Sequence, residues 1–180
     1  MRLWMPLTCF VMGAAVAQEP EETYRPAYSF LRQSEDWSRF HASRPAEDPF
    51  DRLKHVSLSD DGSVWVSFGG RLEARYESWR NFGFAKPNDD GFTLSRAFAH
   101  ADLHLGDNLR FFVEGKTAQS TDRDLPGGRR TLDLDTVDLQ QAFVDVTVPL
   151  GEGELHLRPG RQMLLFGNQR LISPLPWGNT

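Results

Sequence analysis

The feature that most constrains this chain is an alternation of apolar and charged side chains over residues 66–79, VSFGGRLEARYESW. The apolar and small side chains fall on even positions and the charged ones on odd positions, namely Arg71, Glu73, Arg75 and Glu77. Because successive side chains of a strand point to opposite faces, the pattern predicts a strand with one apolar and one charged face. In a helix the same apolar residues would scatter around the axis.

Similar alternation predicts further strands at 92–105, 109–120, 136–148 and 155–166, after a first strand at 64–80. Residues 138–140 follow the opposite phase from residues 141–148, so we expect a bulge near residues 140–141. In the fifth strand Pro159 and Gly160 interrupt the ladder and leave the register open. Trp65 and Trp79, near the ends of the first strand, fit either an interfacial aromatic girdle or ordinary packing.

The predicted connections are short at one end of the strands, at 106–108 and 149–154, and longer at the other, at 84–91 and 121–135. Strands of ten or more residues with this rhythm are typical of an antiparallel transmembrane β-barrel, since about 9–11 tilted residues cross a bilayer. A soluble β-sandwich is the alternative, although its strands are usually nearer 5–6 residues. Five strands is an odd number, so we expect residues 61–180 to be the N-terminal part of an incomplete barrel.

The first 17 residues have the features of a secretory signal peptide: Arg2, an apolar run and the small-x-small sequence Ala15-Val16-Ala17. The single cysteine, Cys9, lies inside it, so the mature chain has no cysteine. Residues 18–60 are polar and contain several prolines; we expect a mostly irregular periplasmic extension in which residues 28–40 could form a short helix. Export and a barrel together predict the outer membrane of a Gram-negative bacterium.

Three stretches resemble the alginate-export family of outer-membrane porins. These are FGGRLEARYE (68–77), preceded by DPFDRLKHVSL (48–58); RAFAHADLHLGDNLRFFVEGK (96–116), followed by LQQAFVDV (139–146); and LRPGRQMLLFGNQRLISPLPWGNT (157–180). The resemblance implies a monomeric 18-stranded barrel whose arginine-lined pore passes an anionic uronate polysaccharide out of the cell. The family usually has an acidic residue after GRQ, where this chain has Met163.

If strand parity holds, eight basic side chains face the lumen together with four acidic ones, an excess of four positive charges, or three if Asp145 also faces inward. The predicted permeant-binding residues in the lumen are Arg71, Glu73, Arg75, Arg96, Arg110, Lys116, Arg158, Arg161 and Arg170. The mature chain, by contrast, carries a net charge of −6. A base-lined pore favours anions. The alternative is that these groups pair with one another and hold the wall.

Other functions find little support. No basic stripe is present, so we expect no nucleic-acid partner. His100 and His104 would lie about 13 Å apart on a strand, too far for one metal ion. Glu73 and Glu77 share a face as glycosidase carboxylates would, but each has arginine neighbours. The acidic stretch 132–138 fits a solvated loop edge better than a calcium site. We therefore expect no enzyme activity, no cofactor and no metal.

Three functional hypotheses follow. The first is an outer-membrane channel that passes an anionic polysaccharide or another anionic solute by passive diffusion through an arginine-lined lumen. The second is a general porin on the same scaffold, and the third is a soluble periplasmic β-sandwich that binds or cleaves polysaccharide. For either channel the partners would be the permeant and outer-membrane lipid, and periplasmic export machinery is a further option.

Overall fold

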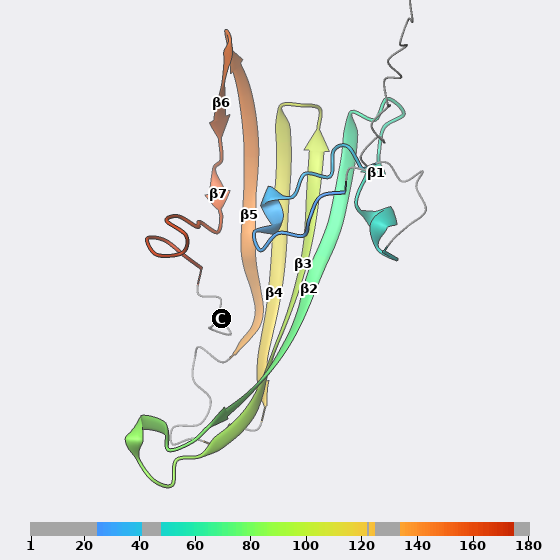
Figure 1. The fold of residues 1–180 in the computed structure, drawn as a ribbon. Helices are drawn as coiled ribbons and strands as arrows, with labels where there is room; N and C mark the ends of the chain where they lie inside the picture. The colour runs from blue at the N-terminus through green and yellow to red at the C-terminus, as the bar shows by residue number, and fades with distance from the viewer. Residues whose placement is uncertain (1–24, 41–47, 122, 125–133, 175–180) are drawn as a thin grey trace, which may run out of the picture.

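The computed structural model describes residues 25–40, 48–121, 123–124 and 134–174. Long antiparallel strands form a single twisted sheet (Figure 1), which confirms the predicted all-β antiparallel fold. The strands are β1 (Val56–Ser57), β2 (Val64–Trp79), β3 (Asp90–Leu105), β4 (Leu109–Thr121), β5 (Asp135–Leu150), β6 (Gly153–Leu157) and β7 (Gly160–Arg161). Three single 3-10 turns are η1 (Arg32–Ser34), η2 (Asp51–Leu53) and η3 (Phe82–Phe84). Among these described elements, no helix is long and apolar enough to cross a membrane. The predicted signal peptide, residues 1–17, lies outside the described residues.

The strands follow one another in the order β1-β2-β3-β4-β5-β6, and β7 continues the pairing on β5 after β6. β2 and β3 pair over 16 residues without a break, from Val64 opposite Leu105 to Trp79 opposite Asp90. From β1 to β6 each strand pairs with the next one along the chain, so the topology is a simple meander. Across the described residues the sheet is open, with β2 near one edge and β6 and β7 at the other.

Tight turns close one end of the sheet. At the entry to β2, the carboxylate of Asp61 accepts hydrogen bonds from the Ser59 hydroxyl at 2.6 Å and from the Ser63 hydroxyl and backbone N–H at 2.8 and 3.1 Å. These hydrogen bonds stabilise the ionised form and lower the pKa of Asp61 to about 2. Gly106 and Gly151 have positive φ angles of 61° and 62° in the two hairpin turns, which favours glycine.

The expected bulge in β5 is present. Glu114 of β4 lies opposite Gln141, whereas its neighbour Gly115 lies opposite Leu139, so Gln140 has no opposite residue. The extra residue reverses the phase of β5, which explains why residues 138–139 and 141–148 follow different parities.

The prediction of a continuous fifth strand over residues 155–166 is wrong. The strand exists as β6 and β7, separated by Arg158 and Pro159, because proline has no N–H to donate to the ladder. Residues 162–165 are not in a strand. Phe166 and Ile172 then form an isolated bridge that encloses a turn at residues 167–170.

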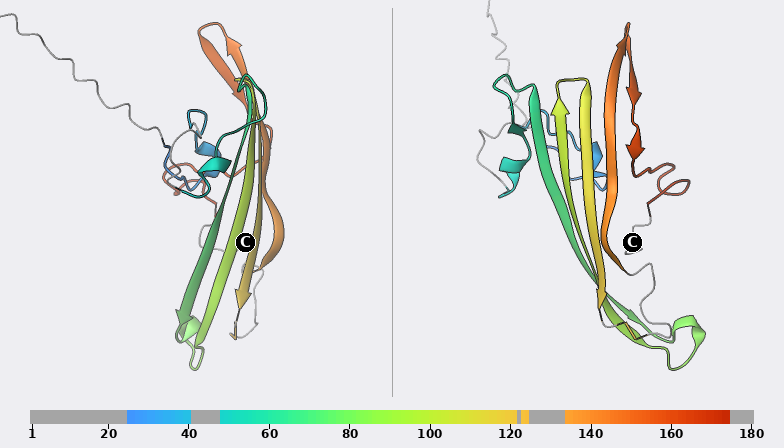
Figure 2. Two further views of the ribbon diagram at one scale, coloured as in Figure 1. Left: turned by 90° about the vertical axis from the view of Figure 1, so that its right-hand side faces the viewer. Right: turned by 180° about the vertical axis from the view of Figure 1, so that it is seen from behind.

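Residues 25–40 and 48–55, called here the N-terminal segment, lie on one side of the sheet (Figure 2). The short helix expected in residues 28–40 is limited to the η1 turn. Trp37 and Phe40 are buried against Trp65 of β2 and form a small apolar core between this segment and the sheet. The rings of Trp37 and Phe40 meet edge to face at 5.3 Å.

Gly160 should be the least tolerant glycine of the β6–β7 edge. Its φ is 133°, and a Cβ atom there would collide with the Ala142 carbonyl oxygen and lie 2.8 Å from the Phe143 Cβ. We expect Gly160→Ala to lower the free energy of unfolding by about 1–3 kcal/mol because this conformation is strained for any L side chain. Urea unfolding in phospholipid vesicles measures the change. Gly153→Ala is the matched control, since a Cβ there meets its nearest atom at an ordinary 3.8 Å; equal losses for both variants would contradict the assignment.

Candidate functional site

The sheet has two chemically different faces. The polar face carries the side chains of Arg71, Glu73, Arg75 and Glu77 and of the residues in register with them on the next strands. The opposite, apolar face carries large apolar side chains that are exposed in the structure: Phe68, Leu72, Tyr76, Phe111, Val113 and Leu139. An exposed apolar surface that extends over several strands marks a region that contacts something other than water.

Most predicted permeant-binding residues lie on the polar face in ion pairs. The closest nitrogen–oxygen distances are 2.6 Å for Arg96–Glu73, 2.8 Å for Arg75–Glu77, 2.7 Å for Arg110–Asp102, 3.0 Å for Lys116–Asp135 and 2.8 Å for Arg161–Asp138. Arg158 makes a two-point contact with Asp145. The geometry agrees with the alternative that these groups pair with one another, while their role toward a permeant stays a prediction.

The predicted set of lumen-facing charges does not include the carboxylates of Asp135 and Asp138, and it includes Asp145 only as an alternative. Each of the three carboxylates forms an ion pair with a base predicted to face the lumen, namely Lys116, Arg161 or Arg158. Together they cancel most of the predicted excess of positive charge. The phase reversal at Gln140 was the available signal, because it places Asp138 on the same face as Gln141.

Arg71 differs from the other bases of the polar face. It makes no ion pair and no hydrogen bond with any residue that the structure describes, and its Nε is buried without a partner. Its guanidinium lies over the ring of Phe98 at 4.4 Å and 5.3 Å from the ring centre of Phe30. The reason lies in the register: Arg71 is opposite Phe98, and Glu73, the next polar-face residue of β2, is opposite Arg96 and bonded to it.

Two of the predicted permeant-binding residues do not lie where the alternation of strand residues would put them. Arg170 lies in the exposed turn at residues 167–170, off the sheet. Arg161 is in register with Ala142, an apolar-face position, yet its guanidinium reaches Asp138. The irregular chain after Pro159 explains both cases, since parity holds only along an unbroken ladder.

Sequence reasoning also missed a row of aromatic rings on the polar face. Phe112 of β4 stacks on Phe143 of β5 with the ring centres 5.2 Å apart. The guanidinium of Arg158 lies 4.4 Å from the ring centre of Phe143. Near the other end of the strands, Arg123 lies 4.0 Å from the ring centre of Phe92. Parity alone would have found the phenylalanines. Rings beside guanidinium groups can contact the apolar faces of sugars while the cations meet carboxylates.

Trp65 and Trp79 belong to this aromatic row and not to a girdle on the apolar face. Trp65 is opposite His104 in the sheet, and the two rings stack with their centres 3.8 Å apart. The ring of His55 also stacks on Trp65, with a centre-to-centre distance of 4.5 Å. Trp79 contacts Phe82 and Phe92. Ordinary packing, the other interpretation of these two residues, agrees with the structure.

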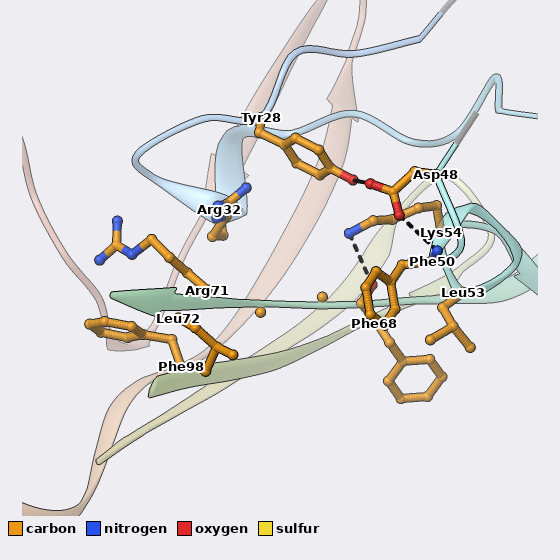
Figure 3. Close-up of a pocket in the computed structure, with 12 residues that line it drawn as sticks. Tyr28, Arg32, Asp48, Phe50, Leu53, Lys54, Phe68, Arg71, Leu72 and Phe98 are labelled. Atoms are coloured by element: carbon orange, nitrogen blue, oxygen red, sulfur yellow. Dashed lines mark hydrogen bonds between the residues drawn. The ribbon is translucent and has the colours of Figure 1, made fainter. Parts of the chain in front are cut away.

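A cavity of about 580 Å³ lies between the N-terminal segment and the edge of β2 (Figure 3). Lys54 lies at its wall, donates a hydrogen bond to the Phe68 carbonyl oxygen at 3.1 Å and sits 5.2 and 5.0 Å from the ring centres of Tyr28 and Trp37. Burial lowers the pKa of Lys54, because desolvation penalises its charged form. Lys54 thus caps a carbonyl at the strand edge. Leu72 of the apolar face also lines the cavity. The cavity therefore extends around the edge of the sheet and is not confined to the polar face.

The sequence model of one family, described as Alginate export, matches residues 64–180. The chain belongs to the alginate export family. The match begins at the first residue of β2, so the N-terminal segment precedes the matched residues. Membership suggests an outer-membrane channel for polysaccharide export, which is a transporter and not an enzyme. A search of curated proteins and a search of solved structures each gave no match.

The Arg110–Asp102 pair should contribute more to stability than the other ion pairs of the polar face. Asp102 accepts two hydrogen bonds of 2.7 Å from Arg110, and the two side chains are 5% and 17% exposed. We expect Asp102→Asn to cost about 2 kcal/mol of unfolding free energy, because it removes the two-point partner of a mostly buried charge and leaves Arg110 with Asp145 at 3.5 Å. Urea titration in vesicles would measure the loss.

Asp138→Asn is the matched control for this prediction. Its partner Arg161 is 57% exposed, so water screens the pair and the expected loss is below about 1 kcal/mol. A cost for Asp138→Asn as large as that of Asp102→Asn would show that burial does not set the strength of these pairs.

Proposed function

We propose that the protein is part of an outer-membrane channel that passes an acidic polysaccharide, such as a uronate polymer, by passive diffusion along the polar face. In this proposal the polar face lines a water-filled lumen and the apolar face contacts lipid. Family membership supports a polysaccharide exporter, and the separation of charge from apolar surface supports the assignment of the faces. The signal peptide and the division of the chain at about residue 60 are part of the same proposal.

The energetic reason for this orientation is strong. An arginine that faces lipid at mid-depth costs roughly 2–4 kcal/mol. Arg71 and Arg75 on β2, Arg96 on β3 and Arg110 on β4 share one face, so the reverse orientation would add several such costs. The apolar face carries exposed Leu72 and Phe111 instead, for which lipid is favourable.

The observation that carries the choice of an anionic permeant is Arg71. It is a cation on the polar face without an ion pair among the described residues, and it lies against an aromatic ring. A uronate carboxylate could bind this guanidinium through two hydrogen bonds, and the sugar face could contact Phe98. Because one contact of this kind is weak in water, a polymer can advance from site to site.

The paired bases add to this path without binding tightly. Arg75 and Glu77 lie at the water-accessible part of the polar face, with side chains 33% and 23% exposed. A passing carboxylate can replace Glu77 as the partner of Arg75 at little net cost, because exposed ion pairs contribute about 0–1 kcal/mol. Such exchange keeps residence times short, as transport by diffusion requires.

The same ion pairs favour a second candidate, a general porin with little selectivity. If nearly every base of the pore is neutralised by a wall carboxylate, the lumen has a small net field. The two candidates differ in whether Arg71 gives the pore a preference for anions.

Neutralising Arg71 should therefore reduce anion selectivity. We expect Arg71→Gln to lower the anion-to-cation permeability ratio about sevenfold, since a unit charge some 7 Å from the permeant is worth roughly 0.6 kcal/mol in water and acts with opposite sign on the anion and the cation. Reversal potentials in planar bilayers under a salt gradient measure this ratio.

Arg80→Gln is the control, because Arg80 follows the last residue of β2 and lies in an exposed bend. It should leave the ratio unchanged. Cation selectivity of the wild type, or an Arg71→Gln ratio equal to that of the wild type, would rule out the anion-selective channel and leave the general porin.

A charge on the apolar face should destabilise the protein according to its depth. Leu72 is 85% exposed near the middle of β2, and we expect Leu72→Arg to cost about 2–4 kcal/mol in a bilayer. Ser78, on the same face near the end of β2, should tolerate arginine at a cost of about 0–1 kcal/mol. The test is urea unfolding in vesicles. Equal and small costs at both positions would favour a soluble sandwich over a barrel.

A further inference from the structure

The N-terminal segment covers part of the polar face. In Figure 2, viewed along the edge of the sheet, residues 25–40 and the η2 turn lie together on one side of the strands. In Figure 1 residues 25–40 run across the sheet toward β5, in the half nearer the short turns, and the η2 turn lies beside the β2 edge. The contacts of this segment show which side it covers, because they involve side chains of the polar face.

Gln33 makes the central contacts. Its side-chain oxygen accepts a hydrogen bond of 3.1 Å from the Gln141 amide, and its backbone oxygen accepts one of 2.8 Å from Arg110. Its own amide donates to the Met163 carbonyl oxygen at 3.4 Å. One residue of the segment is thus bonded to β4, to β5 and to the chain after β7. Gln33 is 5% exposed and Gln141 is fully buried.

Apolar and stacked rings fix the segment on both sides of Gln33. Trp37 is 2% exposed and packs on Trp65, and His55 stacks on the same ring. Trp37 also donates a hydrogen bond to Glu35 at 3.0 Å. On the other side, Phe30 lies beside Arg71. The segment therefore covers two cations of the proposed conduction path, Arg71 and Arg110.

Much of this attachment is made by hydrogen bonds of Gln33 and not by apolar packing alone. Hydrogen bonds such as those of Gln33 exchange with water at a net cost of about 0.5–1.5 kcal/mol each. Only a small cluster of rings, around Trp37, would lose apolar burial if the segment left the face. The attachment is specific, but it can be released in a water-filled lumen.

We propose that the N-terminal segment is a plug in the periplasmic half of the pore, which must leave the polar face before a polymer passes. This inference rests on the proposed function, since it requires the polar face to line a lumen. Short turns of outer-membrane barrels face the periplasm, and the segment lies at that end. A uronate chain entering from the periplasm competes with the Gln33 carbonyl for Arg110 and with the Phe30 ring for Arg71.

Crosslinking tests whether the segment blocks the pore. The double variant Gln33→Cys, Gln141→Cys places one thiol on the segment and one on β5. Within residues 1–180 the native cysteine is Cys9, which lies in the predicted signal peptide. A short bifunctional thiol reagent joined through a reducible bond should link the two positions in the full-length protein in membranes. We expect conductance to fall severalfold after crosslinking and to return after reduction. Gln33→Cys alone is the control and should not respond.

A second variant tests release in the opposite direction. Trp37→Ala removes the ring that holds the segment against Trp65, so conductance should rise by at least about twofold. Phe50→Ala removes an aromatic ring of the same segment that is 62% exposed, and it should leave conductance unchanged. Tryptophan fluorescence and heat-modifiable gel migration would establish that both variants are folded.

The outcomes separate this inference from the proposed function. If the two cysteines fail to crosslink, or if they crosslink without changing an anion-selective conductance, the plug is overturned and the channel stands. An equal conductance for Trp37→Ala and the wild type overturns the plug in the same way. If the thiols crosslink but neither the wild type nor Trp37→Ala conducts ions, both proposals are overturned.

Discussion

The backbone ladder of β2 to β5 is the constraint on which the rest of the structure depends. Once β2 and β3 pair over 16 residues, every second side chain is committed to one side, and a slip of one residue would exchange the two faces. The charged residues Glu73, Arg96 and Asp102 are consequently held on one surface together with their partners, and Arg71 lies on the same surface. The apolar residues at the alternate positions consequently lie on the opposite surface. Ion pairing, aromatic stacking and docking of the N-terminal segment all use this separation.

The polar face is nearly balanced in charge, and this changes how selectivity can arise. A surplus of arginines would act through a long-range field, whereas the observed pairs leave local features to discriminate. Arg71 on Phe98 is such a feature, because the ring occupies the position where a carboxylate partner would otherwise lie. Paired charges hold the polar face together, and the proposed transport uses Arg71, a cation without an ion pair among the described residues. In the proposed plug, Phe30 and Gln33 cover this path.

The sequence was most informative where the ladder is unbroken. The parity of Arg71, Arg96, Arg110 and Lys116 could be read directly, and the bulge at Gln140 followed from the change of phase. It was least informative from Pro159 onward. There the strand is interrupted between β6 and β7, and the positions of Arg161 and Arg170 do not follow the alternation. The pairing partners were also hidden, because Asp135 and Asp138 reach Lys116 and Arg161 across strands whose register depends on the bulge.

By itself, the sequence determined the four long strands, their two faces and the family, since a period of two is a local property of each segment and the match to the alginate export family rests on the sequence. Only the tertiary structure decided which bases are neutralised, that Trp65 and Trp79 pack on the polar face, and that the N-terminal segment lies across Gln141 and Arg110. These are contacts between residues distant in the chain, such as Gln33 and Gln141. Such contacts depend on register and docking, which no local pattern of residues encodes.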